Sequence, residues 1–532
     1  MILKVIKTKN ISKRYERSIK DFSKNWDGNY LSIRDYLQKN YKIDCSIDQD
    51  IISSFSRDWS NLPGFADILL RPKNDVECSI SLKLCYQCKI SITISAGKTN
   101  LTGSATPFGG AILSTSLLTS PSININHNKK EVLCPVGIPL EVMRNEILHQ
   151  SRNKLYYPVD PTSRNDAFVG GTVLCNASGF IPGEKGATRF WVKELHFLLP
   201  NGNLIRAKRG KHISKNGIFV IEDEERTIKI PIPKYKRPKI KNASGPYTCF
   251  KGEIDLVDFI VGSEGIYGLV TICVFELATK PNEHLELFIC LENEKKAISF
   301  HDYLLDYFKG DMSKITALEY FGYNSQNYMK HRNFLFKNTS EVGIYLQIPI
   351  YKGSLENMVQ KWINILSDFD SKIDIENIIV LNDPLNWKKF FEARHSIPDN
   401  ALTKTKQLGG ISIITDTIVP PKNFSKYLDK VHDKLQSNNI EYLLFGHLGD
   451  CHLHFHLIPS NKQDKKCLEI YDYLIDLSSE LGGVYSAEHG TGKRKRNDFR
   501  KCYGNKAVEM VKKAKLAIDP HLILNKGNIF ND

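Results

Sequence analysis

The 532-residue sequence contains no long apolar run. No stretch approaches the roughly 18 uncharged apolar residues that identify a membrane-spanning helix. The first seven residues, MILKVIK, are too short and too charged to form a signal peptide. We therefore expect a cytoplasmic protein, with peripheral contact to the inner face of a membrane as an open alternative.

The sequence also lacks the cysteine spacing of a disulfide framework. Its 12 cysteines are scattered, and Cys85 and Cys88 form the only close pair. No second CxxC or Cys/His pair is spaced to complete a zinc site with this pair. We expect two core thiols near the end of a helix over residues 79–90, which leads into a strand over 90–95.

Two common nucleotide-binding motifs are absent as well. Gly262, Gly265 and Gly268 are spaced GxxGxxG, which excludes the Rossmann fingerprint GxGxxG. The run GTGKRKR at 490–496 lacks both the leading glycine and the Ser or Thr after the lysine that a P-loop needs. No repeat of solenoid or propeller period is visible.

Acidic residues are too few to balance the basic ones, and the net charge is +14. Residues 1–24 carry eight Lys/Arg against two acids, and 206–241 is a second basic stretch. Neither stretch has a nucleic-acid fold signature or an aromatic-rich basic platform, so we expect no nucleic-acid partner. Solvated surface is the expected role, with loose contact to acidic lipid headgroups as the alternative.

Three segments rich in small residues are present, at 95–107, 168–179 and 262–268. Glycine adopts positive φ and lets the backbone approach a ligand closely. Free N–H groups at such turns can bind a pyrophosphate. On spacing alone, ordinary glycine turns explain these segments equally well. From about Phe275 the sequence changes to mixed strand and helix patterns with fewer glycines, which indicates a different domain. The length of the chain also predicts two or three domains.

A histidine cluster follows at 446–457, GHLGDCHLHFHL. Strand alternation places His452, His454 and His456 on one face. A preceding strand over 440–445 and a turn over 448–451 bring His447 back beside them. Converging imidazoles suit a divalent metal, whereas the alternative is an exposed polar face of an edge strand. A metal hydrolase without flavin would explain this cluster but not the glycine segments.

Six segments occur in the order SAGKTNLTGSATP, YPVDPTSRNDAFVGGTVLCNASG, DLVDFIVGSEGIYGLVT, FGHLGDCHLHFHLIP, SAEHGTGKRKR and IDPHLILNKGNIF. In this order they resemble the FAD-linked 2-hydroxy acid dehydrogenases of the vanillyl-alcohol-oxidase type, which act on D-lactate, glycolate or D-2-hydroxyglutarate. The resemblance implies an α+β fold with a PCMH-type two-subdomain FAD-binding module, an antiparallel-sheet cap domain and a C-terminal segment that returns to the FAD domain. The implied boundaries are 1–54 for an N-terminal extension, 55–278 for the FAD domain, 279–485 for the cap and 486–532 for the C-terminal segment.

The resemblance also implies which residues bind the cofactor. They are Gly97, Lys98, Thr99, Asn100, Thr102, Gly103 and Ser104, then Pro158, Asp160, Ser163, Gly170, Gly171, Asn176 and Gly179, and finally Glu264, Gly265, Gly268, Val270 and Asn525. Where the family usually has an arginine and more glycines, this chain has Lys98, which we expect to supply positive charge to the pyrophosphate. No histidine stands at the positions used for covalent attachment, so we expect non-covalent FAD.

In metal-dependent members of the resembled family, the matching ligands are His447, His454 and Glu488, and the matching base is His489. Zinc or manganese is expected from these ligand types. The family usually has Gly and Asn where Cys451 and His452 stand, and an Asn that touches substrate where His456 stands. His456 is therefore a candidate substrate contact, and the extra imidazoles are expected to alter the coordination set or the preferred metal.

Arg394 matches the cap arginine that binds the substrate carboxylate, for which its planar donor fork is suited. Ile414 and Pro398 replace a lysine and a threonine that some members carry, which argues against a dicarboxylate. We expect D-lactate as the substrate, with glycolate second. The electron acceptor is open among quinone, cytochrome and flavoprotein. A flavin-binding accessory subunit of a glycolate-oxidase-like complex, without its own catalysis, is the alternative function.

Overall fold

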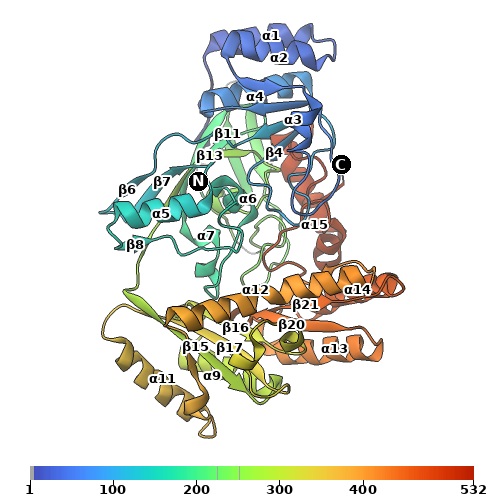
Figure 1. Ribbon diagram of the computed structural model, residues 1–532. Helices are drawn as coiled ribbons and strands as arrows, with labels where there is room; N and C mark the ends of the chain where they lie inside the picture. Colours follow the sequence, from blue (N-terminus) through green and yellow to red (C-terminus); the bar gives the residue numbers. More distant parts are fainter. Residues whose placement is uncertain (1–4, 224–225, 251, 532) are drawn as a thin grey trace.

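The computed structural model describes residues 5–223, 226–250 and 252–531. The chain forms two lobes, one above the other in Figure 1. The core of the first lobe is built from residues between Ile6 and Leu277 together with residues between Ile475 and Phe530. The main core of the second lobe lies between Leu285 and Leu481. The cores therefore divide the chain near 280, although the expected domain boundaries themselves stay predictions.

Two sheets form the two halves of the first lobe. A four-stranded sheet has the order β2 (Asp44–Ser46), β3 (Ile68–Arg71), β5 (Ala111–Ser114) and β4 (Ile92–Ser95). Its last three strands run parallel, and all their residues except Arg71 are buried, as is usual for parallel strands. An antiparallel five-stranded sheet has the order β10 (Leu204–Lys208), β9 (Val192–Leu198), β13 (Leu269–Glu276), β7 (Glu131–Pro135) and β6 (Asn124–Asn126).

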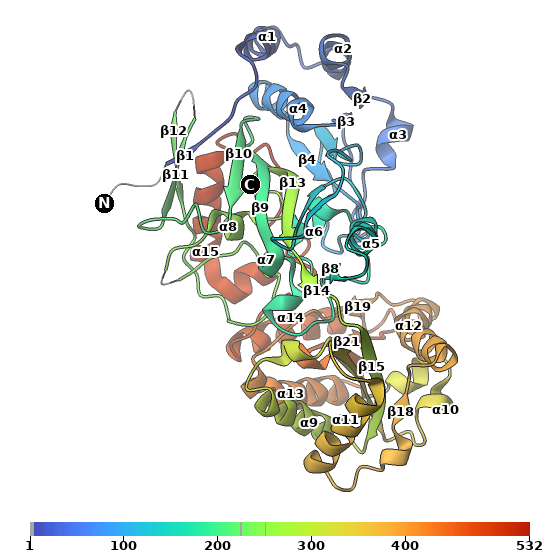
Figure 2. The ribbon, with the colours of Figure 1, turned by 90° about the vertical axis from the view of Figure 1, so that its left-hand side faces the viewer.

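The described part of the expected N-terminal extension is integrated into the first lobe. Strand β1 (Val5–Lys7) pairs in parallel with β11 (Ile218–Glu222), which in turn pairs with β12 (Thr227–Pro231). Helices α1 (Lys13–Lys24) and α2 (Tyr30–Tyr41) cover the end of the lobe (Figure 2). Their apolar faces place Ile19 and Ile33 in the main core with no solvent exposure, so this segment stabilises the lobe.

The C-terminal segment returns to the first lobe. Helix α15 (Arg496–Ile518) lies beside β12, with a kink at Gly504, whose φ is 80°. Beyond the helix, the backbone N–H of Ile92 donates to the carbonyl of Ile523 at 2.7 Å. The N–H of Asn525 donates to the carbonyl of Ile92 at 2.7 Å. The chain end thus adds backbone hydrogen bonds to the edge of β4.

One seven-stranded sheet carries the second lobe. Every pairing in it is antiparallel. Its order is β18 (Ile379–Val380), β15 (Glu283–Leu291), β17 (Val342–Ile350), β16 (Ala317–Phe321), β20 (Tyr442–His447), β21 (His452–Leu457) and β19 (Ile413–Ile414). Helices α9 (Glu294–Tyr307), α11 (Leu355–Phe369), α13 (Phe424–Ser437) and α14 (Asp464–Glu480) share a core with one face. Helix α12 (Pro384–Gln407) packs on the other. These features confirm the expected α+β architecture with an antiparallel cap sheet.

The helix expected over 79–90 is α4 (Asp75–Cys88). It begins earlier because Asn74 caps it by accepting a hydrogen bond from the N–H of Glu77. It ends at Lys89, which has the left-handed φ of 56°. Cys85 and Cys88 are free thiols, and Cys85 is buried. Within the described ranges, no helix combines the length and apolar character needed to cross a membrane.

Candidate active site

The histidine cluster lies on the hairpin of β20 and β21, which is closed by the short turn η6 (Leu448–Asp450). Antiparallel pairing places His447 directly opposite His452. The ring centroids of His452 and His454 lie 4.6 Å apart, and those of His447 and His452 lie 5.6 Å apart. The strand, the turn and the shared face confirm what alternation predicted from the sequence.

Glu488 completes a group of four residues. One ligand atom from each of His447, His452, His454 and Glu488 lies within 4.8 Å of the others. The Glu488 carboxylate lies 3.5 Å from His447 Nε2 and accepts a hydrogen bond from the Ser178 hydroxyl at 3.2 Å. Imidazole nitrogens with a carboxylate form a donor set that suits zinc and other first-row divalent metals.

Glu319, on β16, supports His447 from the outer side. Its buried carboxylate lies 2.5 Å from His447 Nδ1 and 2.9 Å from Arg394 Nη2. Burial would raise the pKa of Glu319, but the charges of His447 and Arg394 hold that pKa at about 2. Burial likewise opposes protonation of His447, yet Glu319 and Glu488 raise its pKa to about 10. The two carboxylates stabilise positive charge at this ring. They would stabilise a metal cation bound at Nε2 in the same way.

His454 has its outer nitrogen bonded too. Nδ1 lies 3.0 Å from the carbonyl oxygen of Thr415, so it donates there and Nε2 is left for a ligand. Burial and the neighbouring His452 lower the pKa of His454 to about 3, which keeps the ring in the neutral form that binds metals. His456 lies further along the same face, outside the group of four. One of its ring nitrogens lies 3.5 Å from the Ser412 hydroxyl.

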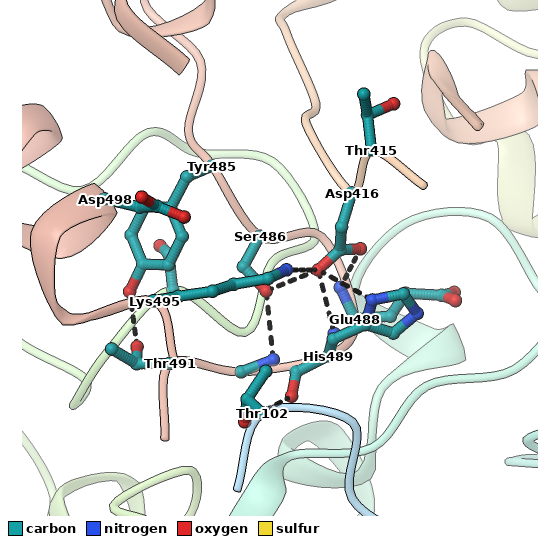
Figure 3. Close-up of polar contacts among 12 residues, drawn as sticks. Thr102, Thr415, Asp416, Tyr485, Ser486, Glu488, His489, Thr491, Lys495 and Asp498 are labelled. Atoms are coloured by element: carbon teal, nitrogen blue, oxygen red, sulfur yellow. Dashed lines mark hydrogen bonds and ion pairs between the residues drawn. The ribbon is translucent and has the colours of Figure 1, made fainter. Parts of the chain in front are cut away.

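Asp416, which follows β19, joins the second lobe to the segment 486–495 (Figure 3). Its side chain is fully buried. Burial would raise its pKa, but His489 and Lys495 hold that pKa well below its usual range. The hydrogen-bond donors to this carboxylate are Ser486 Oγ at 2.6 Å, Lys495 Nζ at 2.8 Å, His489 N at 3.1 Å and Glu488 N at 3.2 Å.

The same carboxylate orients His489. Nδ1 of His489 lies 3.4 Å from Asp416 Oδ2, which favours the tautomer with hydrogen on Nδ1 and leaves Nε2 to accept a proton. The ring lies parallel to that of His454, with centroids 6.1 Å apart. Burial lowers the pKa of His489 even though Asp416 opposes this. A neutral, partly exposed imidazole next to a candidate metal group is suited to general base catalysis.

Arg394 projects from α12 and shares the carboxylate of Glu319 with His447. Its guanidinium lies over the ring of Phe180, 4.8 Å from the centroid. The contact to Glu319 uses Nη2, and a guanidinium has further N–H donors that can bind a substrate carboxylate. Glu319 therefore fixes the positions of a candidate substrate-binding group and a candidate metal ligand.

The three glycine segments meet around α6 (Val169–Cys175). A Cβ atom added at Gly171 would lie 3.3 Å from the Cβ atom of Ala96, which joins the first two segments. The N–H of Glu264 donates to the carbonyl of Leu174 at 2.8 Å, and the Ser104 hydroxyl donates to the Glu264 carboxylate at 2.6 Å. These contacts bring the third segment against the other two.

Buried hydroxyls test whether this cradle fits FAD. Ser95 and Thr106, at the two ends of the first segment, have no hydrogen-bond partner among the described residues, nor has Ser263 in the third. Buried polar side chains are normally paired, so these hydroxyls fit a polar ligand such as the pyrophosphate or sugar groups of FAD. The cradle is therefore compatible with the cofactor expected from the sequence.

Several expected cofactor residues also have roles within the protein. The ammonium of Lys98 donates to the Ser54 carbonyl at 2.6 Å and lies 4.7 Å from the ring centroid of Phe55. Its expected role at the pyrophosphate stays a prediction. The side chain of Asn525 accepts from the N–H of Ile94 and donates to the carbonyl of Glu264, each at 2.7 Å. Asn525 therefore shapes the cradle from the chain end.

Close packing explains several of the expected glycines. A Cβ atom would lie under 3.0 Å from a neighbouring atom at Gly97, Gly103, Gly170, Gly179, Gly265 and Gly268. The neighbour of Gly179 is the Asp160 side chain, so these two expected residues touch each other. Asn176 ends α6 in the left-handed conformation with φ of 50°. Thr102 and Ser104 donate their backbone N–H groups to Asn100, which closes the first loop.

Three residues of the site were not predicted from the sequence: Glu319, Asp416 and Lys495. One signal was available for each acid, because each stands in an otherwise apolar or β-branched run, ALEYF and ITDTIVP. A buried carboxylate in such a run needs a cationic partner. Their partners lie far away in sequence, so the run alone does not identify the site.

Two protein-family models match the chain. Residues 66–208 match the FAD binding domain family, and residues 344–529 match the family of FAD linked oxidases, C-terminal domain. The chain is 24% identical to a D-lactate dehydrogenase of Anaerostipes hadrus, over 91% of this chain and 94% of the relative. It is 24% identical to glycolate oxidase subunit GlcD of Bacillus subtilis, over 87% and 89%. It is 21% identical to a D-2-hydroxyglutarate dehydrogenase of Stutzerimonas stutzeri, over 91% and 95%.

Solved structures share the fold. The 4-ethylphenol oxidase of Gulosibacter chungangensis superposes with a TM-score of 0.64 at 14% identity, covering 99% of each chain. An alkyldihydroxyacetonephosphate synthase superposes with a TM-score of 0.62 at 13% identity, covering 98% of this chain and 86% of the other. Both family matches name FAD, and the cradle is compatible with this cofactor. The chain therefore belongs to the FAD-linked 2-hydroxy acid dehydrogenases and oxidases.

Proposed function

We propose that this enzyme oxidises D-lactate, or with lower preference glycolate, to the 2-oxo acid. Bound FAD would supply the hydride acceptor, and a divalent metal, zinc or manganese, would supply a Lewis acid for the substrate oxygens. We assign the metal ligands as His447, His454 and Glu488. The observation that carries the proposal is the convergence of these three side chains next to His489, with Arg394 joined to them through one buried carboxylate.

His489 would take the hydroxyl proton as the carbon–hydrogen bond breaks. Its pKa lies below the ordinary histidine value because desolvation of the half-buried ring disfavours the charged form, so it is unprotonated at neutral pH. Asp416 lies 3.4 Å from Nδ1 and would stabilise the imidazolium that forms. General base catalysis of this kind typically contributes about 10²–10⁴-fold to a rate.

Arg394 would bind the substrate carboxylate. Two lysines also act on this region, since the charge of Lys241 influences Glu488 and that of Lys495 influences His489. Each is held by a buried aspartate, Lys241 by Asp450 and Lys495 by Asp416. Because both lysines are paired with aspartates, neither offers a binding site for a second substrate carboxylate, which supports a monocarboxylate substrate. His456 stays a proposed substrate contact, and quinone, cytochrome and flavoprotein stay the candidate acceptors.

A substrate screen tests the proposal. The FAD-loaded, metal-loaded enzyme would be assayed anaerobically with a dye acceptor against D-lactate, L-lactate, glycolate and D-2-hydroxyglutarate. We expect kcat/KM to be highest for D-lactate, lower for glycolate and lowest for the dicarboxylate. A higher value for D-2-hydroxyglutarate would contradict the assignment of a monocarboxylate, and no turnover of any 2-hydroxy acid would contradict the proposed function.

A further inference from the structure

We propose that His452 is a fourth protein ligand of the metal, so that the ion is held by three imidazoles and one carboxylate. The inference deepens the proposed function and rests on its metal site. It concerns a residue beyond the three ligands assigned above, and it is carried by the position of the ring, by its unpaired Nδ1 atom and by the contact of Nε2 on its outer side.

The ring of His452 lies close to both assigned histidine ligands. The centroids of His447 and His454 are 6.1 Å apart, whereas His452 is 5.6 Å from the first and 4.6 Å from the second. The hairpin sets this arrangement, because His452 is the cross-strand partner of His447 and stands two positions before His454 on the same strand face. An ion bound by both His447 and His454 would therefore have the ring of His452 beside it.

Within the described residues, Nδ1 of His452 has no polar partner. The side chain is fully buried, Nδ1 has no hydrogen-bond partner, and the polar contact of Nε2 is the one to the Asp416 carboxylate at 3.4 Å. Buried polar atoms are nearly always paired, so such a ring indicates a missing ligand. One of its nitrogens belongs to the group of ligand atoms that lie within 4.8 Å of one another.

The outer contacts follow one pattern in all three rings. In each ring, the nitrogen that points away from the group of ligand atoms contacts an oxygen. Nδ1 of His447 contacts the Glu319 carboxylate, and Nδ1 of His454 contacts a backbone carbonyl. In His452, Nε2 lies 3.4 Å from Asp416 Oδ1. Metal-bound histidines usually direct the second ring nitrogen toward such an oxygen. The pattern leaves Nδ1 of His452 for the ion.

A third imidazole changes which metal is preferred. Imidazole suits zinc, whereas oxygen ligands suit manganese, so His452 should favour zinc over manganese. Zinc expands its coordination readily, so a fourth protein ligand is compatible with substrate binding. The structure therefore assigns to His452 a role in metal affinity and selectivity.

X-ray absorption at the zinc edge of the FAD-loaded protein tests the assignment, together with zinc and manganese affinities from competition with a chromophoric chelator. We expect scattering from three imidazoles in the wild type and from two in His452→Asn. Zinc affinity should fall by at least about tenfold in this variant, and manganese affinity should fall less. The matched control is His456→Asn, which removes a buried histidine from the same strand face and should leave zinc affinity within about threefold. Flavin content checks folding in each variant, and His452→Gln replaces His452→Asn if the latter loses FAD.

Each outcome decides the assignment. Two imidazoles in the wild type, or an unchanged zinc affinity in a folded His452 variant, overturns the role of His452 while the proposed function stands. Absence of any stoichiometric metal in active wild-type enzyme overturns the proposed metal site and this inference with it. Three imidazoles in the wild type and two in His452→Asn would support both the proposed metal site and the role of His452 in it.

Discussion

Substitution of Asp416 by Asn should slow hydride transfer strongly while leaving substrate binding nearly unchanged. Asparagine preserves the size of the side chain and one of its oxygens but removes the negative charge. In the wild type this charge lies 3.4 Å from the ring of His489 and accepts from Lys495 at 2.8 Å. The variant therefore removes the charge that stabilises the imidazolium formed when His489 takes a proton.

The distance between Asp416 and His489 sets the size of the expected loss in rate. For two unit charges 3.4 Å apart in an effective dielectric constant of about 20, the interaction is about 5 kcal/mol. This is an upper bound, because the His489 side chain is 23% exposed and the positive charge of Lys495 opposes part of the effect. A reduction of about 10²–10³-fold in the rate of flavin reduction corresponds to about 3–4 kcal/mol of that bound.

Anaerobic stopped-flow reduction of the bound flavin measures this effect across a range of D-lactate concentrations. The substrate dissociation constant should change by less than about threefold, because Arg394 is held by Glu319 and not by Asp416. Ser486→Ala is the matched control, since it removes a hydrogen bond to Asp416 without changing its charge, and should cost less than about tenfold. A rate of Asp416→Asn within about threefold of wild type would refute the role of this charge.

Further predictions concern the base, the outer carboxylate and the cofactor. His489→Asn should slow flavin reduction by about 10²–10⁴-fold. Because burial lowers the pKa of His489 and its protonated form is inactive, the wild-type rate should rise with pH and level off above an apparent pKa that is lower than the ordinary histidine value of 6.5; a midpoint above that value would contradict this. Glu319→Gln should lower metal affinity by about 10–100-fold in chelator competition, and an unchanged affinity would argue against support of His447 by this carboxylate. Acid precipitation should release all FAD and leave a colourless pellet, whereas a yellow pellet would indicate a covalent bond.

Local patterns in the sequence were sufficient to predict the histidine hairpin. Side chains alternate along a strand with period two, and the turn between the strands is short, so the shared face of His452 and His454 and the return of His447 follow from adjacent residues. The same alternation places His456 on that face, yet in the structure only His447, His452 and His454 form a group with Glu488. Distance along the strand decides this, because each step of two residues moves a side chain by about 7 Å.

The supporting carboxylates could not be predicted in the same way. Glu319 reaches His447 because β16 lies beside β20 in a sheet whose order departs from the sequence order. Asp416 meets His489 because a segment of the second lobe touches the C-terminal segment of the first. Such contacts depend on strand order and lobe packing, which the spacing of residues in a single sequence does not specify.

Reduction of the flavin by D-lactate in the absence of oxygen, with and without bound metal, tests the central claim most directly. The metal-loaded holoenzyme should lose its flavin absorbance on mixing with D-lactate. After chelation, FAD should stay bound but its reduction should be at least about 100-fold slower, and added zinc or manganese should restore the rate. Equal rates with and without metal, or no reduction by any 2-hydroxy acid, would contradict the account.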